Sequence, residues 1–200
     1  MLPKDYLAYM LSGSFVTDMS DASGMLLLDV KNRKWSQEML DIVGITENQL
    51  PKLFESYEII GNIKSELSEE FEISNEVKII IGGGDQAVGA VGTGAVKEGT
   101  VSVALGTSGV IFAPLVNYVV DDNNRLHSFC HANGEYHQMG VMLSAAGALK
   151  WWVEEINKTK DYIILNEEIN KVPVGSEGLY FLPYLMGERT PHNDSNARGC

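Results

Sequence analysis

The sequence predicts an α/β fold, and three stretches carry that prediction. Val77–Ile81 is a β-branched run that ends in three glycines and leads into a helix-compatible stretch of small residues. Thr100–Leu105 and Val110–Pro114 have strand character, and the glycine- and serine-containing loop between them is typical of a hairpin. A third strand and a helix are expected within 136–156. Strands and helices therefore alternate along the chain.

The N-terminal region begins with a short amphipathic helix. Leu2–Leu11 carries apolar residues at helical spacing, and Pro3 lies near its start, where a missing N–H costs least. The next segment, Thr17–Trp35, contains an apolar run between a glycine and turn-forming residues. Its length and composition fit either a strand or a helix, so both assignments stay open.

Two further short helices are expected before the first glycine-rich turn. Ser36 is a candidate N-cap for a helix that extends to Val43 and ends at Gly44. Thr46 and Gln49 have the spacing of a capping box, which predicts a second helix directly afterwards.

The C-terminal region contains a strand at Tyr136–Leu143 and a helix from Ser144 through Ile156. Trp151 and Trp152 in that helix are expected to pack in a core, although one of them could border a nucleotide base. Gly178–Leu185 has strand-like composition and precedes a polar loop. A change of pattern near Gly99 predicts two domains, residues 1–98 and 99–200.

Composition excludes several classes of function. The 200 residues are 44% hydrophobic and 21% charged, as in an ordinary globular protein, and the formal net charge is -12. A nucleic-acid partner is not expected, because binding to phosphate backbones needs clusters of Lys and Arg. No apolar run is long enough for a membrane span, no signal peptide is apparent, and Cys130 and Cys200 read as ordinary thiols, so a cytoplasmic location is expected.

The turn after Val77–Ile81 is the first candidate site. Gly82-Gly83-Gly84 is followed by Asp85 and Gln86, which would place a carboxylate at the carboxyl end of a buried strand, where open α/β sheets bind ligands. By spacing alone, the alternative is that Asp85 is the N-cap of the following helix.

The hairpin loop Gly106-Thr107-Ser108-Gly109 is the second candidate site. It offers backbone N–H groups and two hydroxyls, which can hold phosphate oxygens, but it lacks the Lys of a P-loop. The alternative is a plain hairpin turn, since Gly and Ser favour turns for conformational reasons.

Three other groups of polar residues carry no functional prediction. His127, Cys130 and His131 have spacing compatible with zinc but no fourth ligand nearby. Acidic residues at 66–72 are interpreted as a solvated helix face. Glu188 and Arg189 could form an ion pair, and no role is assigned to them.

Five stretches together resemble the FGGY carbohydrate kinases. GGGDQAVGAVGTGAV followed by ALGTSG resembles the centre of those proteins, and residues 2–36, LPKDYLAYMLSGSFVTDMSDASGMLLLDVKNRKWS, resemble part of their first domain. SAAGALKWW resembles a helix of their second domain. FLPYLMGERTPHNDSNARG resembles a loop of the members that phosphorylate D-xylulose.

The resemblance implies an actin/ribonuclease H-like sugar kinase fold, with ATP and a sugar meeting between two domains. It implies that Asp85 is the catalytic base and that Gln86 contacts the polyol. The phosphates of ATP would lie at Gly106–Gly109, principally at Thr107 and Ser108, and the nucleotide would approach Gly147, where a side chain would be in the way. Mg²⁺ would accompany ATP without a dedicated protein metal site.

The same resemblance implies that these residues form the end of a first domain and the start of a second. The family's opening Asp-x-Gly-Thr loop, its early sugar-binding residues and its late adenine site are absent, so the 200 residues are expected to be inactive alone. D-xylulose is the implied substrate, and glycerol or gluconate remains an alternative. A non-catalytic actin-like nucleotide-binding module is the alternative from another class. A homodimer is expected only from the family.

Overall fold

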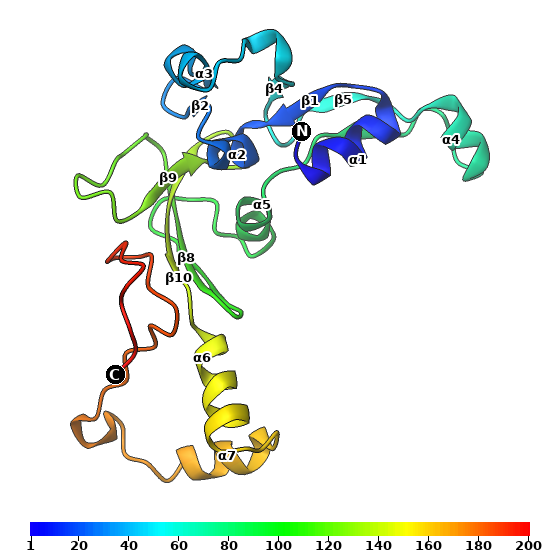
Figure 1. Cartoon of the computed structure of the whole chain (residues 1–200). Helices are drawn as coiled ribbons and strands as arrows, with labels where there is room; N and C mark the ends of the chain where they lie inside the picture. The colour runs from blue at the N-terminus through cyan, green and yellow to red at the C-terminus, as the bar shows by residue number, and fades with distance from the viewer. The chain divides into compact units, whose positions relative to one another are not determined.

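The computed structural model describes residues 1–200, and the chain divides into two compact units (Figure 1). The first unit comprises Met1–Ser102, Phe112–Val120 and His127–Met139. The second comprises Val103–Ile111, Asp121–Leu126 and Gly140–Cys200.

The first unit opens with α1, Pro3–Ser12, which confirms the expected N-terminal helix. Gly13 ends the helix in a left-handed conformation, with φ of 81°, and its N–H donates to the Tyr9 carbonyl at 2.7 Å. Strand β1, Val16–Asp18, follows and pairs in parallel with β4, Lys52–Phe54.

The segment whose structure the sequence left open contains both helix and strand. After β1 the chain forms one turn of helix α2, Met19–Ala22, and the 3₁₀ turn η1, Ser23–Met25. It then forms a small antiparallel hairpin of β2, Leu28–Asp29, and β3, Lys34–Trp35. The apolar run therefore divides between the end of η1, a loop and β2.

Capping signals placed the next elements correctly. Helix α3, Gln37–Val43, has Ser36 as N-cap and Gly44 as left-handed C-cap, with φ of 73°. The second expected helix is only the 3₁₀ turn η2, Glu47–Gln49. Its capping box forms, since the Gln49 Oε1 accepts from the Thr46 N–H at 2.8 Å.

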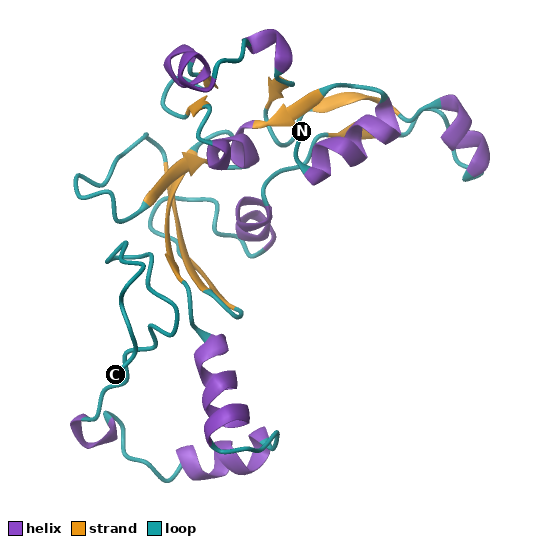
Figure 2. Ribbon diagram, in the orientation of Figure 1, coloured by secondary structure: helices purple, strands orange, loops and turns teal.

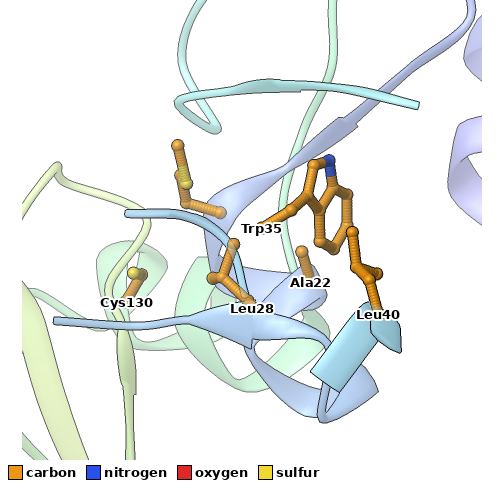
Figure 3. Close-up of a cluster of buried hydrophobic side chains, with 6 residues drawn as sticks. Ala22, Leu28, Trp35, Leu40 and Cys130 are labelled. Atoms are coloured by element: carbon orange, nitrogen blue, oxygen red, sulfur yellow. The ribbon is translucent and has the colours of Figure 1, made fainter. Parts of the chain in front are cut away.

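A hydrophobic core holds these pieces of the first unit together. Its buried members come from α2, β2, β3, α3 and β9 (Figure 3), and they are Met19, Ala22, Leu28, Trp35, Leu40 and Cys130. The Trp35 indole also donates to the Pro51 carbonyl at 3.2 Å, so its one polar group is satisfied inside the core.

Strands β5, Ile59–Asn62, and β6, Lys78–Ile80, form an antiparallel pair, and α4, Ser65–Glu70, lies between them in sequence. The acidic residues around α4 are exposed, which confirms a solvated face. The expectation that the strand before the glycines is buried was wrong: β6 has one neighbouring strand and exposes Lys78 and Ile80. Only the next residue, Ile81, is buried.

The expected hairpin and third strand are present in a four-stranded sheet of order β7-β8-β10-β9. These strands are Ser102–Leu105, Gly109–Leu115, Tyr136–Met142 and His127–Cys130, in that spatial order. The division between units falls within β7, β8 and β10. The sequence did not predict β9, because four residues of mixed polarity give too weak a strand signal.

Helix α6, Ala146–Trp151, continues as the π-helical turn η3, Trp152–Ile156, so the expected helix reaches its predicted end. It begins two residues later than expected. Ala145 is the N-cap and makes no side-chain cap, so Ser144 does not start the helix. Helix α7, Tyr162–Ile169, was not predicted and follows α6 in the second unit (Figure 1).

The strand expected at residues 178–185 and the core position expected for Trp152 were both wrong. Residues 178–185 form no strand; this region is loop after the 3₁₀ turn η4, Ser176–Gly178 (Figure 2). A strand needs a partner along its length, and here Leu182 pairs by backbone hydrogen bonds only with Cys200. Trp152 is 44% exposed rather than in a core, whereas Trp151 is half-buried and stacks on Phe181.

None of the helices combines the length and the apolarity that crossing a lipid bilayer requires.

Replacing Leu40 by Ala tests the core of the first unit. Leu40 is fully buried, so the cavity left behind should lower the free energy of unfolding by about 2–5 kcal/mol. Ile42→Ala, in the same helix but 70% exposed, is the matched control and should change it by less than about 1 kcal/mol. Chemical denaturation measures both, and equal effects would contradict the assignment of α3's buried face.

Candidate active site

Asp85 begins helix α5, Asp85–Gly92, directly after the glycine turn. Gly82 has φ of 72°, a conformation that favours glycine, and Gly84 occupies the N-cap position. Asp85 is therefore not the N-cap, which excludes that alternative. Its side chain is exposed, and the Oδ1 accepts from the backbone N–H of Gln86 at 2.7 Å.

Two buried serines, Ser20 and Ser56, pack against the glycine turn. The Ser20 hydroxyl accepts from the Gly84 N–H at 2.9 Å. At Gly83 the approach is closer still, because a Cβ there would lie 2.8 Å from the Ser20 Oγ and 2.9 Å from the Ser56 Oγ. The position of Asp85 in the first unit thus depends on a tight contact that admits only glycine.

The carboxylate of Asp18 orients both serines. Its Oδ2 accepts from the Ser20 hydroxyl at 2.5 Å, from the Ser20 N–H at 2.8 Å and from the Ser56 hydroxyl at 2.6 Å. Asp18 is fully buried, and Lys4 balances its charge with Nζ 2.8 Å from the Oδ1. Burial opposes protonation of Lys4, but Asp18 and Asp5 raise its pKa.

A cavity of about 100 Å³ adjoins Asp85 within the first unit. Its walls come from α2, the start of α5, β9 and β10, and its lining residues are Ser20, Asp21, Gly24, Gly84, Asp85, Gln86, Ala87, Phe129, His137 and Met139. Sequence reasoning identified Asp85 and Gln86 but missed Asp21 and His137. No local pattern could have found these two, because only folding brings them to the glycine turn.

Asp21 is the second carboxylate of this cavity, and its side chain is 33% exposed. Burial raises its pKa, and Asp18, Asp5 and Asp85 add to that effect, whereas Lys4 opposes it.

The loop Gly106–Gly109 lies in the second unit and connects β7 to β8. The Gly106 N–H donates to the Ser108 carbonyl at 2.9 Å, and the Ser108 hydroxyl donates to the Leu143 carbonyl at 3.4 Å. Gly109 is buried, and a Cβ there would lie 2.8 Å from the Met142 Cγ. Glycine at 109 is thus required for packing against β10.

The same loop lies against the start of α6, which brings Thr107 and Gly147 together. The N–H groups of Ala145 and Gly147 donate to the Thr107 carbonyl at 2.9 and 3.2 Å. A Cβ at Gly147 would lie 3.0 Å from both the Thr107 Cγ2 and the Thr107 oxygen. The absence of a side chain at Gly147 is therefore explained by contact with the loop itself.

A larger cavity, of about 540 Å³, adjoins this contact within the second unit. It is lined by Thr107, Ala146, Gly147, Leu149, Lys150, Trp151, Glu154, Glu155 and Tyr162. Its volume is in the range of small-molecule sites. Lys150 adds a cation, which sequence reasoning missed. Trp151 adds an aromatic face, and the sequence left open whether it packs in a core or borders a nucleotide base.

The candidate residues thus fall into two groups, Asp85 and Gln86 in the first unit, and Gly106–Gly109 and Gly147 in the second.

Glu188 forms no ion pair with Arg189. Its Oε1 instead accepts from two backbone N–H groups, those of Leu143 at 2.9 Å and Arg189 at 2.7 Å.

The residues with zinc-like spacing are engaged in other contacts. His131 lies 3.2 Å from the Ala95 carbonyl through Nε2, and its Nδ1 accepts from the Ala132 N–H at 2.8 Å. Cys130 is in the hydrophobic core. No group of three or more His, Cys, Asp or Glu side chains is arranged to hold a metal ion.

The fold is similar to that of solved carbohydrate kinases. Residues 1–92 match the N-terminal domain of the FGGY family of carbohydrate kinases.

Individual relatives share this similarity over the whole chain. A xylulose kinase of Lactococcus lactis is 43% identical over 200 residues, which are 100% of this chain and 40% of the relative. The crystal structure of a "xyloylose kinase" from Brucella ovis superposes with a TM-score of 0.93 at 43% identity, covering 100% of this chain and 41% of that one. A gluconate kinase from Lactobacillus acidophilus superposes with a TM-score of 0.89 at 32% identity, covering 98% and 40%. The chain thus spans about two fifths of the length of these relatives.

Gly83→Ala tests the contact behind Asp85. A methyl group there must displace both serine hydroxyls from a buried network, so we expect a loss of about 1–3 kcal/mol in unfolding free energy. Gly89→Ala in α5 has open space around the added methyl and should stabilise by about 0.5–1 kcal/mol. Thermal unfolding of both variants is the measurement, and a neutral Gly83→Ala would show that the turn tolerates a side chain.

Proposed function

We propose that the protein carrying this chain transfers the γ-phosphoryl group of ATP to a hydroxyl of a sugar, with D-xylulose as substrate and D-xylulose 5-phosphate as product. The observation that carries the proposal is the exposed Asp85 carboxylate at the wall of a small cavity, in a chain similar to xylulose kinases along its whole length.

Asp85 serves as the general base. The sugar hydroxyl oxygen attacks the γ-phosphorus, the bond from that phosphorus to the β-γ bridging oxygen breaks, and ADP leaves. Asp85 accepts the hydroxyl proton. The Gln86 N–H supports this role because it fixes the carboxylate at 2.7 Å, and the Gln86 side chain adds a polar group for the polyol in the same cavity.

The second unit would bind the nucleotide. Thr107 is exposed at the edge of the 540 Å³ cavity, with Gly147 and Lys150 also in its lining. Gly106, Ser108 and Gly109 set the shape of the loop rather than forming the cavity wall. Lys150 supplies positive charge suited to phosphate oxygens, and Trp151 a surface suited to a base.

Magnesium fits the second carboxylate of the first unit's cavity. Mg²⁺ is usually held by one or two carboxylates, substrate phosphates and several waters, and Asp21 lines the cavity beside Asp85 and would be available to it. When bound with ATP, the ion would neutralise phosphate charge.

Several further proposals rest on the family. Residues 1–98 would belong to the sugar-binding domain and residues 99–200 to the nucleotide-binding domain, with the N-terminal domain match at 1–92 in support. Both cysteines are free thiols, which supports a cytoplasmic enzyme. A homodimer stays a prediction.

The first experiment measures ADP formation by the full-length protein with MgATP and a panel of D-xylulose, gluconate and glycerol. We expect turnover to depend on D-xylulose. The similarity to a gluconate kinase makes gluconate the second candidate substrate. Faster turnover with gluconate than with D-xylulose would make gluconate the assigned substrate. ATP binding without polyol-dependent turnover would instead favour a non-catalytic module. The 200 residues assayed alone should give no turnover.

Asp85→Asn should lower kcat by at least about a hundredfold, because an amide cannot accept the proton while its shape is nearly the same. ATP binding, measured by calorimetry, should change less than about threefold. Asp122→Asn, an exposed Asp outside both cavities, is the matched control and should keep full activity. Retained turnover in Asp85→Asn would refute the base assignment.

Gly147→Ala should raise the KM for ATP several-fold, because the added methyl displaces Thr107 at the edge of the proposed nucleotide cavity. The KM for the sugar should stay within about twofold. Ala148→Gly, in the same helix but outside the cavity lining, controls for changes in the helix itself. Equal changes in both KM values would point to general damage rather than to a nucleotide site.

A further inference from the structure

His137 on β10 is a buried polar side chain that the reaction outlined above does not use. It is only 3% exposed, and its Nδ1 is buried without a hydrogen-bond partner. Buried polar atoms are normally paired, so an unpaired one in a native structure calls for a ligand, a water or a functional reason. His137 also lines the cavity that contains Asp85.

A neighbouring buried histidine, His131, shows that burial in this region does not by itself leave a ring nitrogen without a hydrogen-bond partner. His131 has a partner for each ring nitrogen, the Ala95 carbonyl and the Ala132 N–H. Its ring lies 5.9 Å from that of His137, between centroids, but it does not line the cavity. Of these two buried histidines, His137 lines the cavity, and its Nδ1 is the ring nitrogen without a hydrogen-bond partner.

Aromatic contacts hold the His137 ring in place. It stacks on Phe112 with centroids 4.0 Å apart and rings 22° from parallel, and it meets Phe129 edge to face at 5.9 Å. These contacts orient the imidazole without using its nitrogens. A ring fixed in this way is preorganised for a ligand and loses little entropy on binding.

The ring is also neutral at working pH. Burial lowers the pKa of His137 to about 3, His131 acts in the same direction, and the Cys130 carbonyl opposes them. A neutral imidazole has one N–H donor and one acceptor nitrogen. The unpaired Nδ1 can pair with a hydroxyl group whether or not it carries the proton, because a hydroxyl both donates and accepts, whereas an ionised phosphate only accepts.

We propose that His137 is a sugar-binding residue that hydrogen-bonds a hydroxyl of the neutral polyol held against Asp85. The inference rests on the proposed kinase function, because it takes the Asp85 cavity as part of the sugar site. Gln86 then supplies another polar group around that hydroxyl-bearing end of the substrate.

The test is the steady-state kinetics of His137→Phe in the full-length protein, with D-xylulose varied and then ATP varied. Phe keeps the ring stack and removes both nitrogens, so the KM for the sugar should rise at least about fivefold while the KM for ATP stays within twofold. The melting temperature should hold or rise, because an unpaired buried nitrogen is removed. His131→Phe is the matched control: it should lower the melting temperature and leave the sugar KM unchanged.

Two further measurements keep the inference falsifiable if His137→Phe misfolds. His137→Gln retains a donor and an acceptor and should keep the sugar KM within about threefold. In the wild-type protein, the ¹⁵N resonances of the His137 ring should shift on addition of D-xylulose alone. Wild-type turnover with a normal sugar KM in His137→Phe, or unshifted ring resonances, would overturn this inference and leave the proposed function standing. Absence of polyol-dependent turnover in the wild type would overturn both.

Discussion

The buried carboxylate of Asp18 is the interaction on which the first unit's site depends. A fully buried charge must be paired, and Asp18 takes its partners from separate parts of the chain: Lys4 in α1, Ser20 in α2 and Ser56 after β4. Those bonds fix both serines against the glycine turn. Asp85 therefore takes its position from a network to which it makes no direct bond.

The second unit depends on close backbone contact in the same way. Gly109 packs against Met142, and Gly147 packs against Thr107, at distances where a Cβ would collide with its neighbour. The first N–H groups of α6 donate to carbonyls of the loop. These donors join loop and helix, so the proposed binding of phosphate would depend on Thr107, Lys150 and the rest of the cavity wall.

Most predictions that rest on short-range chemistry were confirmed, although Ser144 does not start α6, and those that need a distant partner were less reliable. Ser36 and Gly44 bound α3 because caps act within one turn, and the glycine pattern located both loops. The strand expected at 178–185 is absent because nothing pairs along it. Trp152 is exposed and β6 is not buried, because burial depends on what packs against a side chain rather than on its polarity.

By itself, the sequence determined the α/β class, the resemblance to carbohydrate kinases, and the two glycine turns that carry Asp85 and Thr107, because turn chemistry and motif residues are contiguous along the chain. Only the tertiary structure decided which residues surround them. Asp21 and His137 join Asp85 in one cavity, and Trp151 and Lys150 join Thr107 in another. Residues from well-separated segments meet only when burial and hydrogen bonding of the whole unit are satisfied together, and no local pattern records that outcome.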